Sequence, residues 1–286
     1  MSAALIHTIP EMRRAVAEAR REGRTVGLVP TMGALHEGHG ELIRRARAAS
    51  GFVVVSVFVN PIQFDRGDDY ERYPRTLPTD LEFCSALGAD AVFSPSGEEM
   101  YPTPQLAFVE VEKVSEGLCG AFRPGHFRGV ATVVTKLFQI VQPDCAWFGE
   151  KDAQQLAVIR RMTADLNIPV EIAGVPIVRE PDGLAMSSRN RRLSPEERAA
   201  APALYAALRE AEAAVRRGCT DPDAVRNLAL AVLARNPHVR LEYLEVVDEG
   251  TFQPVREISG PVRIAAAAWL GGTRLIDNVP CAGSAR

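Results

Sequence analysis

The sequence predicts an α/β protein, with a doubly wound parallel sheet in its N-terminal part and a smaller α+β domain in its C-terminal part. Over the first 179 residues, short β-branched apolar runs alternate with helical patterns, as in βαβ units. One run, Phe52 to Val59, is almost wholly apolar, which is typical of a strand buried on both faces. Beyond that part, helical patterns are followed by strands. We therefore expect two domains, residues 1–179 and 180–286.

The elements of the first domain follow from local signals. A capping box at Thr8 to Glu11 predicts a helix that ends near Gly23. Thr79 is expected to cap a short helix that ends at Gly88. The other expected helices are about His39–Ala49, Val130–Val141 and Asp152–Leu166, and the expected strands are Thr25–Val29, Phe52–Val59, Ala91–Phe93, Phe108–Val111, Cys145–Phe148 and Val170–Val178.

The second domain begins with helix signals. Ser194 to Glu197 is a capping box with proline at the first helical position, and it opens a long Ala-rich helix. Asp221-Pro222 starts another helix. Strands are expected at Leu241–Val247 and Val262–Leu270, and Gly271-Gly272 turns the second of these into Arg274–Asn278 as a hairpin.

Bulk composition excludes several classes of protein. Of the 286 residues, 47% are hydrophobic and 24% are charged, which is ordinary for a soluble globular chain. A net charge of -3 gives no chain-wide basic field for nucleic acid. No apolar run approaches the roughly 18 residues that a membrane helix needs. The five cysteines form no CxxC and are odd in number, and no signal-peptide pattern precedes them, so we expect free thiols in the cytoplasm.

The segment PTMGALHEGH, from Pro30 to His39, lies between a predicted strand and a predicted helix start. Ligands of doubly wound sheets bind at the carboxyl ends of strands, and helix N-termini attract phosphate. His36 and His39 add donors, and the glycines allow close approach of a nucleotide. A pair of ordinary polar loop residues is the alternative for His36 and His39. A zinc site is disfavoured, because the string is not HExxH and no Cys/His cluster is nearby.

Two further blocks end predicted strands with polar groups. Asn60 and Gln63 in VNPIQF offer neutral amides to a small substrate, although an Asn-Pro turn would read the same way. In FGEKDAQQ, Lys151 can contact phosphate as a point charge. Asp152 can cap the helix or hold a ribose hydroxyl or a metal, and Gln155 lies one turn beyond Lys151.

Three loops complete the set. DGLAMSSRN, from Asp182 to Asn190, combines two hydroxyls with Arg189, which is a phosphate-clamping set, or it is an ordinary polar linker. RPGHFRGV, from Arg123 to Val130, carries two arginines that could meet a carboxylate, and we expect a structural role for His126. Asp65 to Thr76 is expected to be a solvated loop, with a lid as the alternative.

These blocks, in this order, closely resemble the pantothenate synthetase (pantoate–β-alanine ligase) family of the HxGH nucleotidyltransferase superfamily. The resemblance extends through KLFQIVQPDCAWFGEKD, YLEVVDEG and LGGTRLIDN and covers nearly the whole chain. It departs at Ala153 and Gln139, where relatives often have an aromatic residue and Asn. The MSSR block also resembles the lysine-serine loop of class I aminoacyl-tRNA synthetases.

The resemblance implies ATP-dependent condensation of (R)-pantoate with β-alanine to pantothenate, AMP and pyrophosphate through a pantoyl-adenylate. It also implies a Rossmann-like N-terminal domain, a smaller C-terminal domain acting as a lid, Mg²⁺ dependence and a homodimer. The protein ligands of the metal stay unknown, with Asp80 as a weak candidate. The implied catalytic residues are His36, His39, Lys151, Ser187, Ser188 and Arg189; the implied ATP-binding residues are Met32, Gly33, Ala34, Leu35, His36, Glu37, Gly38, His39, Gly149, Glu150, Lys151, Asp152, Val178, Met186, Ser187, Ser188 and Arg189; the implied substrate-binding residues are Gln63, Gln155, Asn60 and Arg123.

Elementary chemistry agrees with this set of residues. A carboxylate with an ordinary pKa near ~4 is already ionised at neutral pH and needs no base to attack a phosphate. Positioning and charge neutralisation are what the reaction requires. No residue of the sequence stands out as the base that would deprotonate the amine of β-alanine. Two alternatives stay open. One is a nucleotidyltransferase that retains the nucleotide in its product, and the other is a non-catalytic nucleotide-binding module. A class I synthetase is disfavoured, because the chain lacks room for a tRNA-binding domain.

Overall fold

The computed structural model describes residues 2–64 and 67–282, and the chain divides into two compact units. Unit 1 comprises the chain up to Val111 together with Arg123–Glu150 and Val158–Pro176. Unit 2 comprises Glu112–Phe122, Lys151–Ala157 and the chain from Ile177 onwards. The chain therefore leaves unit 1 twice before its final departure. The predicted boundary after residue 179 and the lid role of residues 180–286 stay predictions.

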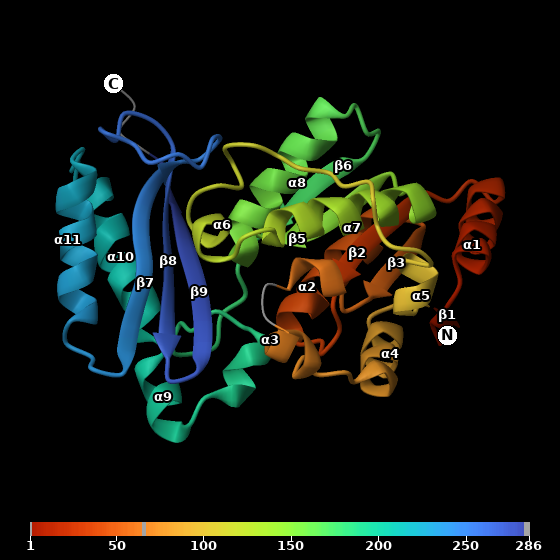
Figure 1. Cartoon of the computed structure of the whole chain (residues 1–286), viewed down its shortest axis with the longest axis horizontal. Helices are drawn as coiled ribbons and strands as arrows, with labels where there is room; N and C mark the ends of the chain where they lie inside the picture. Colours follow the sequence, from red (N-terminus) through yellow and green to blue (C-terminus); the bar gives the residue numbers. More distant parts are fainter. Residues whose placement is uncertain (1, 65–66, 283–286) are drawn as a thin grey trace. The chain divides into compact units, whose positions relative to one another are not determined.

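Unit 1 is built on one parallel sheet, which confirms the predicted α/β architecture (Figure 1). Its strand order is β1-β4-β3-β2-β5-β6, and every pairing between neighbours is parallel. Strand β3 is buried along its whole length, as its apolar sequence predicts. The strands are β1 Ala4–Ile6, β2 Val26–Thr31, β3 Phe52–Val57, β4 Ala91–Phe93, β5 Cys145–Gly149 and β6 Glu171–Val175.

Helices cover both faces of this sheet, so it is doubly wound. Helix α2 packs with α4 on one face, where Leu42 and Ile43 meet the odd-numbered valines of β3. Helix α1 packs with α7 and β2 on the opposite face. The helical segments that include these are α1 Ile9–Arg21, α2 Glu37–Ala49, α3 Gly67–Glu71, α4 Leu77–Ala86, α5 Gly97–Met100, α7 His126–Val141 and α8 Ala153–Asp165, with a 3₁₀ turn, η1, at Pro61–Gln63.

Strand order creates a switch point between β2 and β5. These strands are neighbours, with Gly27 opposite Cys145, but the chain runs from β2 to β3 on the other side. Loops that leave the carboxyl ends of two such strands diverge and open a ligand site in doubly wound sheets. The loop after β2 begins at Met32, and β5 ends at Gly149. Two of the predicted ATP-binding segments therefore begin at this point of unit 1.

Unit 2 has the predicted α+β architecture. Three antiparallel strands, in the order β7-β8-β9, pack against helices on one face (Figure 1). Leu204 and Leu208 of α10 are fully buried with Leu244 and Ile264 of the sheet. Its elements are α6 Cys119–Phe122, a 3₁₀ turn η3 Ser188–Arg192, α9 Pro195–Ala200, α10 Ala203–Arg216, α11 Pro222–Leu233, β7 Val239–Asp248, β8 Val262–Leu270 and β9 Thr273–Cys281.

Three sequence predictions of local structure are wrong. Phe108–Val111 alternates like a strand but forms none, because no strand of the described chain pairs with it. Helix α4 begins at Leu77 after Thr76, not at Thr79, because Pro78 is tolerated in the first helical turn. The predicted long Ala-rich helix is two helices, α9 and α10, divided at Pro202, which lacks the N–H that a continuous helix needs.

Two smaller findings concern the surface and the cysteines. Part of the predicted solvated loop, Asp65 to Thr76, forms α3, while Asp65 and Arg66 lie outside the described residues. Within the described ranges, every helix is too short or too polar to cross a membrane. All five cysteines are free, as predicted.

Candidate functional site

The predicted site residues fall into two groups, one in each unit. Unit 1 holds the loop after β2, the two amides that follow β3, the arginine before α7 and the end of β5. Unit 2 holds the turn that contains the lysine and the Ser-Ser-Arg loop. The first group is Met32–His39, Asn60, Gln63, Arg123, Gly149 and Glu150, and the second is Lys151, Asp152, Gln155, Val178 and Met186–Arg189.

The loop after β2 is shaped by a buried carboxylate. Asp80, only 2% exposed, accepts hydrogen bonds from the backbone N–H of Ala34 at 3.0 Å and of Leu35 at 2.8 Å. Thr76 donates a third at 3.1 Å. Gly33 has a φ of +81°, and a Cβ there would lie 3.0 Å from an Asp80 oxygen. Both oxygens of Asp80 are thus engaged, which favours a positioning role for this residue over the metal contact considered from sequence.

The two histidines cap helix α2 reciprocally. Nδ1 of His36 accepts from the backbone N–H of Gly38 at 3.2 Å, and Nδ1 of His39 accepts from the backbone N–H of His36 at 3.3 Å. Their rings are 4.1 Å apart between centroids. An Nδ1 that accepts from an amide carries no proton, so the neutral ring carries its proton on Nε2. Both histidines therefore present an Nε2–H donor.

The two histidines thus belong to the start of α2, and their contact with phosphate stays a prediction. Their backbone-side nitrogens build the start of α2, while their Nε2–H groups are of the donor type that phosphate oxygens accept. The helix start adds backbone N–H groups and the positive end of its dipole. The HEGH sequence therefore forms a donor-rich helix N-terminus that can bind an anion.

The amides after β3 form a closed set of contacts. Asn60, 1% exposed, donates from Nδ2 to Oε1 of Gln63 at 2.9 Å and to the carbonyl of Gly129 at 3.2 Å. Its Oδ1 accepts from the hydroxyl of Tyr101 at 2.7 Å. Both Nδ2 hydrogens of Asn60 are used, so this amide orients Gln63. The Nε2 of Gln63 points to the sulfur of Met32 at 3.3 Å, which joins this group to the loop after β2.

His126 and Arg123 fix the backbone of the same turn. Nδ1 of His126 lies 2.8 Å from the carbonyl oxygen of Gln63, and its Nε2 lies 3.2 Å from an Arg123 nitrogen. Because a guanidinium only donates, Nε2 of His126 accepts and its Nδ1–H donates to Gln63. The structural role expected for His126 is therefore confirmed: its ring holds the backbone carbonyl of Gln63 in place. Arg123 therefore lies beside the turn that carries Gln63.

Gly129 allows helix α7 to approach the turn. A Cβ on Gly129 would lie 2.5 Å from the carbonyl oxygen of Ile62 and 2.6 Å from Cα of Gln63. Real Cβ atoms are not found so close to backbone atoms, so only glycine fits here. The position of Gln63 thus depends on the absence of a side chain on α7.

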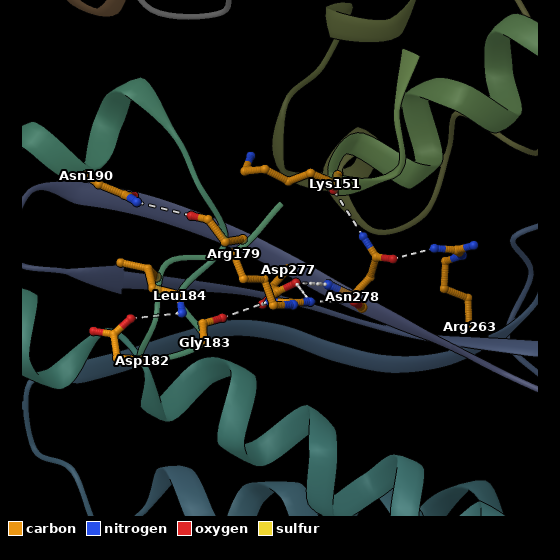
Figure 2. A network of polar contacts seen from close by, with 10 residues as sticks. Lys151, Arg179, Asp182, Gly183, Leu184, Asn190, Arg263, Asp277 and Asn278 are labelled. Atoms are coloured by element: carbon orange, nitrogen blue, oxygen red, sulfur yellow. Dashed lines mark hydrogen bonds and ion pairs between the residues drawn. The ribbon is translucent and has the colours of Figure 1, made fainter. Parts of the chain in front are cut away.

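Lys151 lies in the 3₁₀ turn η2, Glu150–Asp152, directly after β5. Its side chain is 20% exposed, and its Nζ is 3.8 Å from the carboxylate of Asp152. Its backbone carbonyl accepts from Nδ2 of Asn278 at 3.0 Å (Figure 2). Gln154 anchors the next turn by accepting from the Cys119 N–H at 3.0 Å. The half-buried amide of Gln155 has no hydrogen-bond partner within residues 2–64 and 67–282 and is available to a ligand.

The Ser-Ser-Arg loop follows a short hairpin. Arg179 bridges Ala185, and the N–H of Met186 donates to the carbonyl of Val178 at 3.0 Å. Ser187 then caps η3 by accepting from the N–H of Arg189 at 3.3 Å. Ser187, Ser188 and Arg189 therefore stand at the start of a tight turn. Phosphate binding by this loop stays a prediction.

Metal-ligating side chains of the described residues do not cluster into a metal site. No group of three or more His, Cys, Asp or Glu side chains in the described part of the chain could hold a metal by itself. Mg²⁺ is commonly held by one or two carboxylates together with substrate phosphates.

Sequence reasoning missed several residues of the site. Tyr101, Gly129 and Thr76 each hold a predicted residue. Gly129 lies in the block RPGHFRGV and Thr76 ends the segment Asp65 to Thr76, but the sequence assigns neither of them this role. Burial raises the pKa of the Tyr101 hydroxyl, so it stays a donor to Asn60. Gly129, directly before the predicted helix Val130–Val141, is the signal in the sequence that points to close packing.

Comparison with known proteins gives a consistent result. The family model for pantoate-beta-alanine ligase matches residues 4–280. The chain is 54% identical to the pantothenate synthetase of Heliobacterium modesticaldum, over 96% of this chain and 98% of that protein. It is also 54% identical to the pantothenate synthetase of Thermotoga neapolitana, with the same coverage.

Two solved structures are similar over almost their whole length. Pantothenate synthetase from Thermus thermophilus has a TM-score of 0.91 and 46% identity, and covers 96% of this chain and 98% of its own. The ligase from Francisella tularensis, in complex with "Beta-gamma ATP" and β-alanine, has a TM-score of 0.81 and 33% identity, with 97% of both chains covered. The chain described here belongs to the pantoate–β-alanine ligase family.

Proposed function

We propose that this protein condenses (R)-pantoate with β-alanine, using ATP, to give pantothenate, AMP and pyrophosphate. The observation that carries the proposal is the set of donors built by His36, His39 and the start of α2 in a chain of this family. In the first step, a pantoate carboxylate oxygen bonds to the α-phosphorus and the bond to the β-phosphate oxygen breaks. Pyrophosphate leaves, and a pantoyl-adenylate is formed.

In the second step, the amine of β-alanine attacks the acyl carbon of the adenylate. The acyl C–O bond breaks, AMP leaves with the former carboxylate oxygen, and the amine loses a proton. No base for that proton is assigned. The Francisella tularensis relative, whose solved complex holds β-alanine, supports an amine of this kind as the second substrate.

ATP is assigned to residues of both groups. His36 and His39 donate from Nε2 to phosphate oxygens, and Lys151 and Arg189 add positive charge that stabilises the oxyanions of the transition state. Ser187 and Ser188 add hydroxyl donors. We assign the remaining contacts to Met32–Gly38, Gly149, Glu150, Asp152, Val178 and Met186.

Pantoate is assigned to Gln63 and Gln155, with Arg123 as a partner for its carboxylate. The Oε1 of Gln63 is already occupied by Asn60, so Nε2 is the group it offers to a hydroxyl of pantoate. Asn60 acts by holding that orientation. A neutral amide suits the diol part of the substrate, because it adds no charge beside a carboxylate.

Three further assignments complete the proposal. Mg²⁺ enters with ATP and offsets the charge of its phosphates. The protein acts as a homodimer in the cytoplasm; the segment 104–111, which is neither helix nor strand and in which Leu106 is 91% exposed, supports a partner surface. Residues 180–286 act as a lid. Small-angle scattering of the protein with and without ATP would test this closure.

The deciding experiment follows isotopes through the two steps. With pantoate, ATP and Mg²⁺ alone, labelled pyrophosphate should exchange into ATP. Addition of β-alanine should then give AMP and pantothenate, with ¹⁸O from the pantoate carboxylate found in AMP. ADP as the product would indicate an acyl phosphate, and release of pyrophosphate without AMP would indicate a nucleotidyltransferase that keeps the nucleotide. A bound nucleotide with no turnover would indicate a binding module.

A further inference from the structure

Two neighbouring residues of strand β9, Asp277 and Asn278, contact two separate segments of unit 2 that carry predicted ATP-binding residues (Figure 2). Asn278 contacts the turn of Lys151, and Asp277 contacts the hairpin that leads to Ser187. Both residues are almost fully buried, because Asn278 is 3% exposed and Asp277 is 4% exposed. Neither belongs to the sets assigned above to ATP or to pantoate.

The amide of Asn278 has a fixed orientation. Its Oδ1 accepts a short hydrogen bond from Arg263, and its Nδ2 donates to the carbonyl of Lys151 at 3.0 Å. A guanidinium only donates and a carbonyl only accepts, so the reversed amide would oppose like groups on both sides. Arg263 is itself held by the Glu249 carboxylate, with contacts as short as 2.6 Å. The chain Glu249–Arg263–Asn278 thus fixes the backbone of Lys151.

Asp277 fixes the other segment through Arg179. Its oxygens accept from the two terminal nitrogens of the guanidinium at 2.6 and 2.9 Å, which is a bidentate ion pair. Arg179 also donates to the carbonyl of Gly183 at 3.0 Å and stacks on the Tyr205 ring at 3.6 Å. Gly183 forms the tip of the hairpin that runs from Arg179 to Ala185. Arg179 therefore ties the base of the hairpin to β9 and the tip of the hairpin to its base.

The end of the hairpin is held as well. Asn190 donates to Glu180 at 2.8 Å and to the carbonyl of Ala185 at 3.1 Å, so η3 is fixed to the same hairpin. The N–H of Asn278 donates to Oδ1 of Asp277 at 2.7 Å and couples the two contacts within one dipeptide. A shift of either segment would therefore displace the other, because both are bonded to the same two residues of β9.

We propose that the Asp277–Asn278 dipeptide is the positioning element that holds the Lys151 turn and the Ser187–Arg189 loop in register for phosphate chemistry. The dipeptide touches no substrate in this assignment and acts only through those two segments. A displacement of about 1 Å in a charge-stabilising group can lower a rate about 10²-fold, which is why such restraint matters. This inference rests on the proposed adenylation function.

The main test replaces Asn278 with Asp. Asn278→Asp keeps the size and an acceptor for Arg263, but turns an oxygen toward the carbonyl of Lys151, so the donor is lost. Loss of a supporting hydrogen bond of this kind typically costs about 10- to 100-fold in activity. We expect pantoate-dependent pyrophosphate exchange to fall by at least about 10-fold, while the KM for pantoate stays near that of the unmodified protein. Asn278→Ser, which is uncharged but too short to reach, should show the same loss.

Two readouts separate positioning from a general loss of structure. Aminolysis of preformed pantoyl-adenylate by β-alanine should be nearly unchanged in both variants, because it does not need the pyrophosphate-side charges. In the Lys151→Ala variant, Asn278→Asp should lower the rate of pyrophosphate exchange by less than about a further twofold. The effects of residues that act as a unit are non-additive. Asn227→Asp, the same change on the exposed surface of α11, is the matched control and should leave both half-reactions unchanged.

The Arg179 contact has its own variant. Arg179→Lys keeps the charge but cannot make the two parallel bonds to Asp277 and the bond to Gly183 together. It should lower exchange and raise the KM for ATP without moving the KM for pantoate.

The outcomes are distinguishable. If the unmodified protein shows no pantoate-dependent exchange, the proposed function fails. If it exchanges and Asn278→Asp and Asn278→Ser match it, the positioning role is wrong. Equal losses in both half-reactions, or full additivity with Lys151→Ala, would likewise overturn the role of the dipeptide.

Discussion

Oδ1 of Asp80 accepts a hydrogen bond from the backbone N–H of Leu35 at 2.8 Å, across 45 residues of sequence. Its other oxygen accepts from Ala34. Asp80→Asn would place an NH₂ group against one of these N–H donors and leave a buried donor unpaired. We expect the free energy of unfolding to fall by about 1–3 kcal/mol, and ATP binding to weaken because the loop after β2 shifts. Urea unfolding and calorimetry measure both effects.

Asp165→Asn is the control for this change. Asp165 lies at the end of α8, half-exposed, in an ion pair with Arg161. Exposed pairs contribute about 0–1 kcal/mol. Equal stability losses for the two variants would show that the loop does not depend on Asp80.

Gly129→Ala tests the approach of α7 to the Gln63 turn. The added Cβ would lie 2.5 Å from a backbone oxygen, so helix and turn must separate. Overpacking of this kind costs about 1–3 kcal/mol, and the affinity for pantoate should fall as Gln63 moves. Gly97→Ala, where a Cβ meets open space, should change neither the urea midpoint nor pantoate binding. Unaltered pantoate affinity in Gly129→Ala would contradict the prediction.

Lys151→Ala tests the phosphate role of the lysine. Removal of one preorganised donor typically lowers the rate by about 10²–10³. We expect that loss in single-turnover adenylation, with much less effect on pantoate affinity. Lys113→Ala, at an exposed position, is the matched control. Near-normal adenylation in Lys151→Ala would remove the lysine from the mechanism.

Gln63→Glu tests the pantoate amide at constant size. The glutamate keeps an acceptor for Asn60 but replaces the Nε2 donor with a negative charge beside a carboxylate substrate. Pantoate binding at neutral pH should weaken markedly because like charges repel. Isothermal calorimetry gives the affinity, and Gln139→Glu on the exposed face of α7 serves as control. An unchanged dissociation constant would place Gln63 outside the pantoate site.

Thiol labelling should follow burial. Burial raises the pKa of Cys84 to about 12 and of Cys145 and Cys281 to about 11. A raised pKa lowers the thiolate fraction at any pH below it, and thiolate is the reactive form. In native protein at pH 8, iodoacetamide should therefore modify the partly exposed Cys219 first, while labelling of Cys145 keeps rising toward pH 11. Mass spectrometry reads the order, and early labelling of Cys84 would contradict it.

Periodicity and strand–helix alternation were sufficient for the fold class because they are local. The apolar run of β3 and the capping boxes at Thr8 and Ser194 mark elements without knowledge of distant residues. Phe108–Val111 shows the limit of this reasoning. Its alternation is strand-like, but a strand also needs a neighbour, and pairing is decided by the tertiary fold.

The same limit applies to the site. His36 and His39 are predictable because their spacing places both at one helix start. The partners that orient such residues lie far away in sequence: Asp80 holds Leu35, and Tyr101 holds Asn60. No local pattern encodes those contacts. A single sequence therefore identifies the side chains that can take part in a reaction more readily than the distant residues that orient them.

The bond from Asn278 to the carbonyl of Lys151 spans 127 residues, and this separation has a consequence for synthesis. A ribosome makes the lysine turn 127 residues before it makes the residue that restrains it. Until residue 278 leaves the exit tunnel, the nascent chain holds Lys151 without the contact from β9. Under the proposed positioning role, adenylation at the full rate therefore requires β9, and a chain truncated before β9 would carry the nucleotide motifs without the contact that positions them.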